Sequence, residues 1–478
     1  MTRPEASGAA NASPNASPDI ITNADARAAT AAGLRIGYCT NVHAGTALSG
    51  VRENLRVHAR AVRERLINVG TDARWTQPMG IGLWLAADAA RELRAEDGVA
   101  ALRDDLAELG LQAFTFNGFP AGNFHRRSVK HAVYRPSWDD PRRLAFTRDL
   151  AEIIAALHDA GDEASISTLP IGWRAWTDDD AMQRAVLHLR LTAMHLAELE
   201  RRTGVFVHVD LEPEPGCVLD RPGDVVRFFE QWLLAGASAT EERVVRRHLR
   251  VCHDVCHAAV MFDGQAESMR VFDAAGIHVG KIQVSAALDI DFRRMPEAVR
   301  AAALERLDAF AEPRFLHQTA IRRRSDGPVE LLDDLPMAIT RARRPATSDS
   351  AAGDPVDEHW RVHFHVPIHA DDLTPLASTA PMIDEAVSAA FDRGVRHFEI
   401  ETYAWNVLPE AMQPDALAEG IADELQWFLK RPSVRAMMDG TAAEAADPPL
   451  VEVVPGAVPD RSPEAASAEP DPSGGSSR

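Results

Sequence analysis

The sequence predicts an α/β fold, a (β/α)₈ barrel that carries an insertion before its last strand. Short runs rich in β-branched and aromatic residues alternate with long amphipathic segments, the pattern of βαβ units around a parallel sheet. Apolar residues recur at helical spacing in the connecting segments, for example in 49–66 and 178–202. Eight such alternations occupy about 400 residues, which is the size of a barrel with insertions.

Eight segments have the composition and length of barrel strands. They are residues 34–40, 79–85, 111–119, 164–173, 205–214, 249–257, 279–288 and 395–405. Two further β-like runs, 313–321 and 360–370, fall between the seventh and eighth strands. We assign them to an insertion at about 290–380, above the barrel mouth where such folds place their chemistry.

Composition limits the possible partners and compartments. The chain has 478 residues, with 51 Lys and Arg against 71 Asp and Glu, so its formal charge of −20 argues against nucleic acid as a partner. Its four cysteines are too few and scattered for a disulfide framework. Because we find neither a membrane-spanning apolar run nor a secretory signal, we expect a cytoplasmic protein whose partner is a small-molecule metabolite.

The two ends of the chain differ from the rest. Residues 1–31 and 439–478 are rich in Ala, Ser and Pro and show no apolar period. Such segments cannot bury enough apolar surface to fold. We therefore expect two disordered tails around a barrel domain at 32–438.

Polar residues alternate with apolar ones in the fifth and eighth predicted strands. The polar faces carry His208, Asp210, Glu212 and Glu214 in one strand and His397, Glu399, Glu401 and Tyr403 in the other. The apolar faces must meet the helices, so the polar faces point into the barrel. Unpaired carboxylates there would cost several kcal/mol each. They therefore require a metal, a cation or water.

The sixth and seventh strands add candidate ligands. Asp254 and His257 have Asp-x-x-His spacing, and Lys281 and Gln283 share a face of the seventh strand. Three carboxylates with an amide or imidazole suit Mn²⁺ or Mg²⁺, and Zn²⁺ if a histidine takes part. The alternative is a network of salt bridges in the lumen, with Lys281 or an arginine as the cation.

The order LEPEP, DVCHA and IETY along the chain resembles the xylose-isomerase-like superfamily of sugar isomerases, sugar epimerases and endonuclease-IV-type enzymes. In that superfamily a Glu, an Asp, a His and a Glu on the last four strands hold the metal. The resemblance implies metal binding by Glu212, Asp254 and Glu401, with His257 nearby. At the position of the usual histidine the chain has Gln283, which departs from the pattern.

A closer resemblance covers nearly the whole predicted barrel. The segments IGYCTNVH, FTFNGFP, LEPEPGC, CHDVCHAAV, HFHVP and ETYAW are similar to the metabolite traffic protein EboE family. That family is a TIM-barrel group encoded in ebo gene clusters and associated with moving or processing secondary-metabolite precursors. The resemblance implies a role in secondary metabolism, with other ebo-cluster proteins as candidate partners.

The superfamily chemistry implies proton transfer beside the carbonyl of a hydroxy-carbonyl substrate, with Glu212 and Glu401 as acid and base as well as ligands. One alternative is a non-catalytic protein that binds or carries a metabolite. Another is an endonuclease-IV-like hydrolase, which the charge of −20 disfavours.

Further candidates for substrate binding lie after the strands and in the insertion. After the strands, barrels place their catalytic groups. Histidines of the insertion could form a lid, although a single histidine is more often structural. The candidates are Asn41, His43, Asn117, His208, Lys281, His317, His363 and His365.

Overall fold

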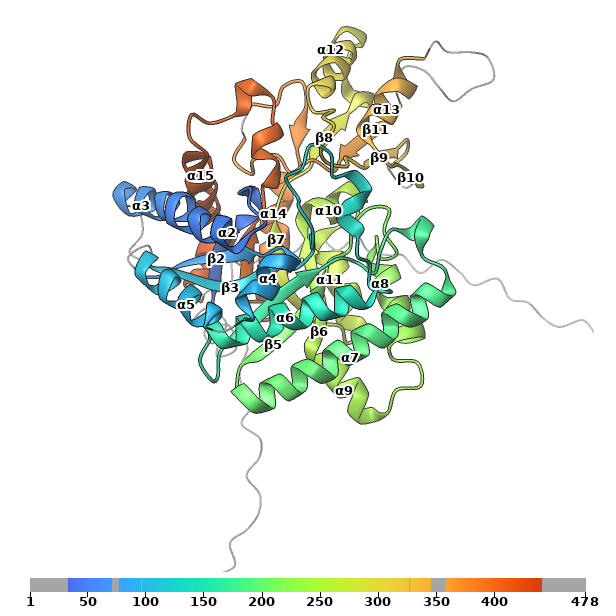
Figure 1. Cartoon of the computed structure of the whole chain (residues 1–478). Helices are drawn as coiled ribbons and strands as arrows, with labels where there is room; N and C mark the ends of the chain where they lie inside the picture. Colours follow the sequence, from blue (N-terminus) through green and yellow to red (C-terminus); the bar gives the residue numbers. More distant parts are fainter. Residues whose placement is uncertain are drawn as a thin grey trace, which may run out of the picture. The chain divides into compact units, whose positions relative to one another are not determined.

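Eight parallel strands close into a barrel in the computed structural model, in the order β1-β13-β7-β6-β5-β4-β3-β2 (Figure 1). The strands are β1 (Arg35–Cys39), β2 (Met79–Trp84), β3 (Leu111–Asn117), β4 (Glu163–Thr168), β5 (Phe206–Leu211), β6 (Leu249–Asp254), β7 (Val279–Val284) and β13 (His397–Ile400). Each corresponds to one predicted segment. The predicted barrel class, with an insertion before the last strand, is confirmed.

The structure describes residues 33–70, 77–95, 97–325, 327–344, 357–370 and 372–440. The tail predicted at 1–31 lies outside the described residues. So does the tail predicted at 439–478, apart from its first two residues.

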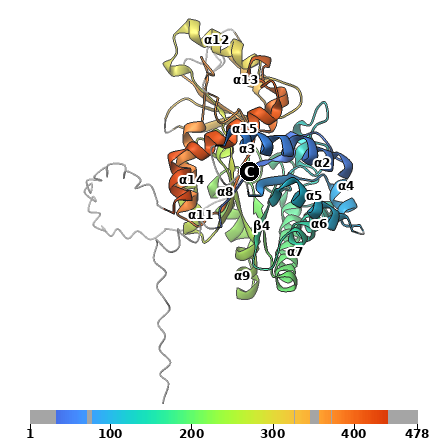
Figure 2. The same cartoon turned by 90° about the vertical axis from the view of Figure 1, so that its left-hand side faces the viewer.

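Helices surround the barrel strands, and two more belong to the insertion at the top of both views (Figures 1 and 2). They are α2 (Leu48–Asn54), α3 (Arg60–Val69), α4 (Ala87–Leu93), α5 (Gly98–Leu109), α6 (Pro141–Leu157), α7 (Asp179–Thr203), α8 (Pro222–Phe228), α9 (Ala239–His248), α10 (Val255–Val260), α11 (Gln265–Ala274), α12 (Glu297–Asp308), α13 (Leu335–Ala342), α14 (Ile383–Phe391), α15 (Leu417–Lys430) and α16 (Pro432–Met438). The longest, α7, begins after Asp178, whose side chain caps the Ala181 amide. It ends at Thr203 and is followed by Gly204, where a φ of 75° favours glycine.

The lower part of the barrel lumen is polar. The His208 and His397 rings stack there with centroids 5.9 Å apart, and His397 Nδ1 lies 2.8 Å from Ser165 Oγ. One step higher, the fully buried Lys281 forms an ion pair with Glu399. Gly82 makes room for this pair, because a Cβ at that position would overlap the Glu399 carboxylate. The strand alternation thus directs polar faces into the lumen, as predicted.

The sixth predicted strand extends three residues too far. β6 ends at Asp254, whose Oδ1 accepts the His257 backbone amide at 2.8 Å and caps α10. An aspartate three residues before a free amide favours a helix start over a longer strand. His257 therefore lies in the first turn of a helix and not on the strand.

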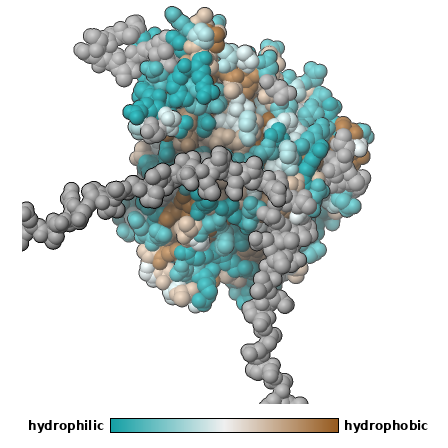
Figure 3. All heavy atoms as spheres, turned by 180° about the vertical axis from the view of Figure 1, so that it is seen from behind, coloured by the Kyte–Doolittle hydropathy of each residue, from teal (hydrophilic) through white to brown (hydrophobic). Residues whose placement is uncertain are grey.

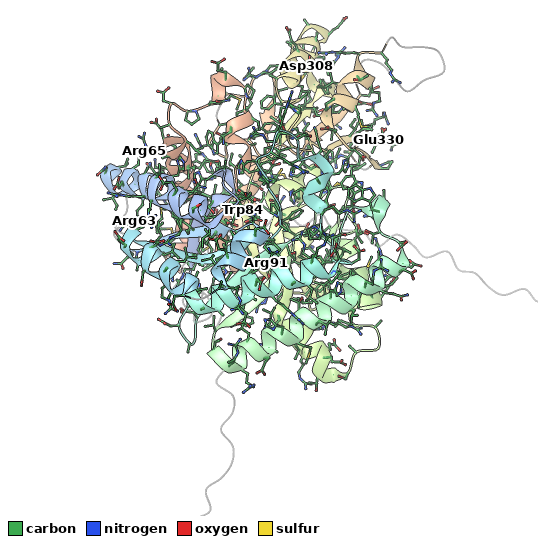
Figure 4. All side chains as sticks on the ribbon, viewed as in Figure 1. Arg63, Arg65, Trp84, Arg91, Asp308 and Glu330 are labelled. Carbon is green, nitrogen blue, oxygen red and sulfur yellow. The ribbon has the colours of Figure 1, made fainter. Side chains whose placement is uncertain are left out.

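The insertion forms a second sheet between β7 and β13. Its strands are β8 (Leu288–Asp291), β9 (Thr319–Arg322), β10 (Val329–Leu332), β11 (His359–Val362) and β12 (Ala377–Ser378), in the antiparallel order β10-β9-β11-β8-β12. The helices α12 and α13 lie beside it, and Figure 4 marks this region by Asp308 and Glu330. The two predicted runs supply only β9 and β11. The other three strands were not predicted.

On the face of the molecule seen in Figure 3, hydrophobic residues form small patches between hydrophilic ones. The exposed large apolar side chains include Val57, Leu187 and Met337. Scattered apolar side chains of this kind are normal on a protein surface. Within the described ranges, no helix is both long and apolar enough to cross a membrane.

Candidate metal centre and pocket

A pocket lies at the carboxyl ends of the barrel strands. Its polar lining includes Asn41, Asn117, Glu212, Glu214, His257, His363, His365 and Glu401. An apolar wall faces them, formed by Phe119, Pro120, Phe124, Val129, Val133, Phe315 and Leu316. The pocket therefore combines residues that follow barrel strands with residues of the insertion.

Three buried carboxylates meet at the base of this pocket. Glu212 follows β5, Asp254 ends β6 and Glu401 follows β13, and one oxygen from each lies within 4.8 Å of the others. The three residues are 5% exposed or less. Carboxylates this close and this buried repel one another strongly. With Gln283 beside them, we name this group the carboxylate site.

Burial and like charge change the pKa values in the carboxylate site. Burial, followed by the charge of Asp254, raises the pKa of Glu401 to about 8. Burial also raises the pKa of Glu212 well above its usual value, and the charges of Glu401 and Asp254 raise it further. Burial would also raise the pKa of Asp254, but His257 and His365 lower it. Metal-free protein therefore favours protons on the two glutamates.

Three amides hold the Glu401 carboxylate. Asn41 and Asn117 donate to Oε1 at 2.7 and 2.8 Å, and Gln283 Nε2 donates to Oε2 at 3.0 Å. Amides at the ends of β1, β3 and β7 thus fix one carboxylate without neutralising its charge. Asp254 Oδ1 accepts from Ser285 Oγ at 2.9 Å.

The remaining oxygens of the site fit a divalent cation. Among the described residues, Glu212 Oε2, Asp254 Oδ2 and Gln283 Oε1 are buried without a hydrogen-bond partner. Because Gln283 gives its amide nitrogen to Glu401, its oxygen is left without a partner. Hard oxygen donors of this kind suit Mg²⁺ or Mn²⁺. Buried unpaired acceptors would otherwise be costly.

Three of the predicted histidines reach the pocket from two elements. His257 comes from α10, and His363 and His365 follow β11 in the insertion. Burial lowers the pKa of His257 to about 4, and it lowers the pKa of His363 and His365 as well. Their rings are therefore neutral at ordinary pH, which is the form that binds metals.

Other predicted binding residues lie away from the pocket. His43 Nε2 lies 3.1 Å from the Tyr38 hydroxyl, and its ring stacks on His58. His317 contacts Glu312 and the backbone oxygen of His363, so it positions that segment.

Two more predicted binding residues belong to the lower lumen. His208 Nδ1 lies 2.6 Å from Asp210 Oδ1, and Lys281 pairs with Glu399. The predicted alternative, a salt bridge in the lumen, is thus found between Lys281 and Glu399. For the carboxylate site, no described lysine or arginine lies within ion-pair distance of Glu212, Asp254 or Glu401.

Several pocket residues were not singled out as site residues from the sequence. Glu214 Oε1 accepts from the Tyr134 hydroxyl at 2.8 Å and from Gln318 Nε2 at 3.1 Å. Burial raises the pKa of Glu214 to about 7. The alternation that marks Glu212 also marks Glu214. The loop from 118 to 140 and the insertion, which form the apolar wall, offer no such periodic signal.

Comparison with known proteins yields distant structural matches alone. No family model matches the chain, and no curated protein matches it. A xylose isomerase-like TIM barrel protein from Mycobacterium smegmatis in complex with magnesium is 12% identical, over 86% of this chain and 99% of that chain, with a TM-score of 0.45.

Two further solved structures are similarly distant. A xylose isomerase domain protein from Alicyclobacillus acidocaldarius is 11% identical over 85% of this chain and 99% of that one, with a TM-score of 0.39. The IOLI protein with a binding zinc atom is 11% identical over 85% and 98%, with a TM-score of 0.40. At these values the likeness assigns neither an activity nor a metal to this chain.

Proposed function

We propose that the protein is a divalent-metal-dependent enzyme that moves a proton beside the carbonyl group of a small hydroxy-carbonyl metabolite, as sugar isomerases and epimerases do. The carboxylate site carries this proposal. Three buried carboxylates within 4.8 Å, with unpaired oxygens and no lysine or arginine partner among the described residues, form a cation site at the base of the pocket.

The residues of the site have separable roles in this proposal. A bound Mg²⁺, Mn²⁺ or Zn²⁺ would polarise the oxygens of the substrate. Glu401, fixed by Asn41, Asn117 and Gln283, is the rigid carboxylate. Glu212 lines the pocket, and its Oε1 can take or return the proton while Oε2 is kept for the cation. Glu401 is its partner as acid or base.

The pocket favours a substrate with an apolar or aromatic portion. The Phe124 ring packs against the Phe315 and Tyr403 rings, with ring centroids 4.8 and 5.4 Å away, and all three residues line the pocket. A bare sugar would leave these side chains against hydroxyl groups. A hydroxy-carbonyl compound with a ring or alkyl end would fill both halves of the pocket. This fits the resemblance to the EboE family, and we extend the proposal to precursors of secondary metabolites.

Solvent-proton exchange tests the proposal without knowledge of the natural substrate. Metal-stripped protein would be reloaded with Mn²⁺ or Mg²⁺ in D₂O, with 2-hydroxyacetophenone or D-fructose added. Loss of the signal of the proton beside the carbonyl would be followed by NMR. We expect exchange that depends on metal and is faster for the aromatic compound. Glu212→Gln should lower the rate at least 100-fold.

A matched control keeps the test specific. Glu198→Gln makes the same chemical change at an exposed position of α7, where the carboxylate contacts Arg201, and should leave exchange unchanged. A protein that binds such a compound with its metal but never exchanges the proton would contradict catalysis. That result would support the alternative, a non-catalytic carrier of metabolites.

A further inference from the structure

Two histidines and a glutamate form a second cluster of ligand atoms beside the carboxylate site. Glu214 follows β5, His257 belongs to α10 and His363 follows β11. One ligand atom from each lies within 4.8 Å of the others, and all three side chains are buried. The cluster uses neither Glu212 nor Glu401. We name it the histidine site.

Hydrogen bonds set the orientation of both rings. His257 Nδ1 donates to the Pro213 backbone oxygen at 2.9 Å, and His363 Nδ1 donates to Gln318 Oε1 at 2.7 Å. The Gln318 amide is itself oriented, because its Nε2 donates to Glu214, to the Tyr134 hydroxyl and to the Pro215 backbone oxygen. A neutral imidazole that donates through Nδ1 presents a lone pair at Nε2.

The two lone pairs face each other. His257 Nε2 lies 3.1 Å from His363 Nε2, with the ring centroids 4.5 Å apart. Two acceptors at this distance repel unless a positive charge lies between them. Zn–N bonds of 2.0–2.1 Å in a tetrahedral site separate two ligand nitrogens by about 3.3 Å. The observed separation is close to that of two imidazoles on one ion.

Glu214 provides the third ligand. Its Oε1 accepts from Tyr134 and Gln318, while Oε2 is buried and has no hydrogen-bond partner in the part of the chain that the structure describes. His363 Nδ1 lies 3.6 Å from Glu214 Oε1, so the carboxylate and the ring are neighbours. Gln318 thus orients a ring and a carboxylate at once, as residues behind metal ligands do.

We propose that Glu214, His257 and His363 bind a second divalent cation of borderline softness, such as Zn²⁺ or Co²⁺. Two imidazoles and one carboxylate are the ligands such ions prefer, and a fourth position toward the pocket would take water or substrate. Two residues of the LEPEP segment would then bind different ions, Glu212 the ion of the carboxylate site and Glu214 the ion of the histidine site. The insertion completes the second site by supplying His363.

Cobalt titration of the full-length, metal-stripped protein tests this proposal. Tetrahedral Co²⁺ with nitrogen ligands absorbs visible light far more strongly than octahedral Co²⁺ with oxygen ligands. We expect two equivalents of Co²⁺ and a strong visible band. His363→Ala should lose the band and one equivalent, while Glu401→Gln should lose the other equivalent and keep the band.

Two further variants keep the result interpretable. Glu214→Gln retains an acceptor for Tyr134 and should weaken the band-forming ion at least 10-fold even if His363→Ala fails to fold. His195→Ala, on α7 and away from both sites, should behave as the wild type. The histidine site would be overturned if the wild type showed no visible band. It would also be overturned if Glu214→Gln and a folded His363→Ala bound the Co²⁺ ion that gives the band as tightly as the wild type does. A single ion lost only in Glu401→Gln would overturn it as well and support the carboxylate site. A single ion lost only in His363→Ala would support the histidine site and contradict the carboxylate site.

Discussion

Removal of one carboxylate from the carboxylate site should stabilise the metal-free protein. In Glu401→Gln, the side chain keeps its shape but no longer shares a buried site with Glu212 and Asp254. Gln283 can turn its amide so that Oε1, which has no partner among the described residues, accepts from the new amide group. Asn41 and Asn117 keep their acceptor.

The magnitude follows from the pKa of Glu401, which burial and Asp254 raise from 4.5 to about 8. Each pH unit above 4.5 is worth about 1.4 kcal/mol, so protonation on folding costs about 3 kcal/mol at pH 7. The entropy of unfolding for about 390 described residues is about 0.8 kcal/mol/K. The variant should therefore melt about 4 °C higher.

The sign depends on pH and on metal. A carboxyl with a raised pKa stabilises the fold fully below pH 4.5, and this contribution is lost as pH rises through 8. The advantage of Glu401→Gln should thus be absent near pH 4.5 and largest above pH 8. With Mn²⁺ at about 100 times its Kd, the wild type should gain about 2.7 kcal/mol and the variant far less.

Thermal unfolding by circular dichroism, in EDTA and in Mn²⁺, measures both effects. Glu198→Gln serves as the control, because its carboxylate is exposed and should change neither melting temperature. The reasoning is refuted if Glu401→Gln lowers the melting temperature in EDTA, or if it gains as much from Mn²⁺ as the wild type does.

Three other changes test buried charged residues. Lys281→Met leaves the buried Glu399 carboxylate without its cation and should lower the free energy of unfolding by about 3–5 kcal/mol in urea, whereas adding Glu399→Leu should restore most of it. Gly82→Ala should also destabilise, because its Cβ overlaps Glu399, and the loss should shrink in a Glu399→Ala background. Glu424 is buried on α15, where its Oε1 accepts from the Thr402 hydroxyl at 2.6 Å. Burial raises the pKa of Glu424 to about 7, so its stabilising effect is complete below pH 4.5 and lost as pH rises through 7. Glu424→Gln should flatten the stability profile between pH 5 and 8, and an unchanged profile in urea titrations would contradict this.

The strand alternation made part of the candidate site predictable. In a strand of period two, Glu212 and Glu401 had to share a face with other polar residues, and eight such strands had to close around a lumen. The ion pairs inside that lumen could not be predicted from the sequence, because they depend on the register between neighbouring strands. Lys281 lies opposite His397 in the β7–β13 ladder, and it pairs with Glu399.

The parts that were not predicted lack periodic signals. β12 has two residues, too few to show an alternation. Phe119 and Phe124 lie in a loop, where nothing in the local sequence indicates that they face a cavity. His257 was placed on a strand because the helix cap at Asp254 interrupts the β-rich run without a change in composition.

Diffraction from crystals grown with Mn²⁺, recorded at the manganese absorption edge, tests the carboxylate site most directly. We predict an anomalous peak within 2.0–2.4 Å of oxygens from Glu212, Asp254 and Glu401, about the bond length of such ions to oxygen. Gln283 Oε1 should complete the protein ligands. Density for water alone among the three carboxylates, at a Mn²⁺ concentration that occupies sites elsewhere, would contradict the proposed metal centre.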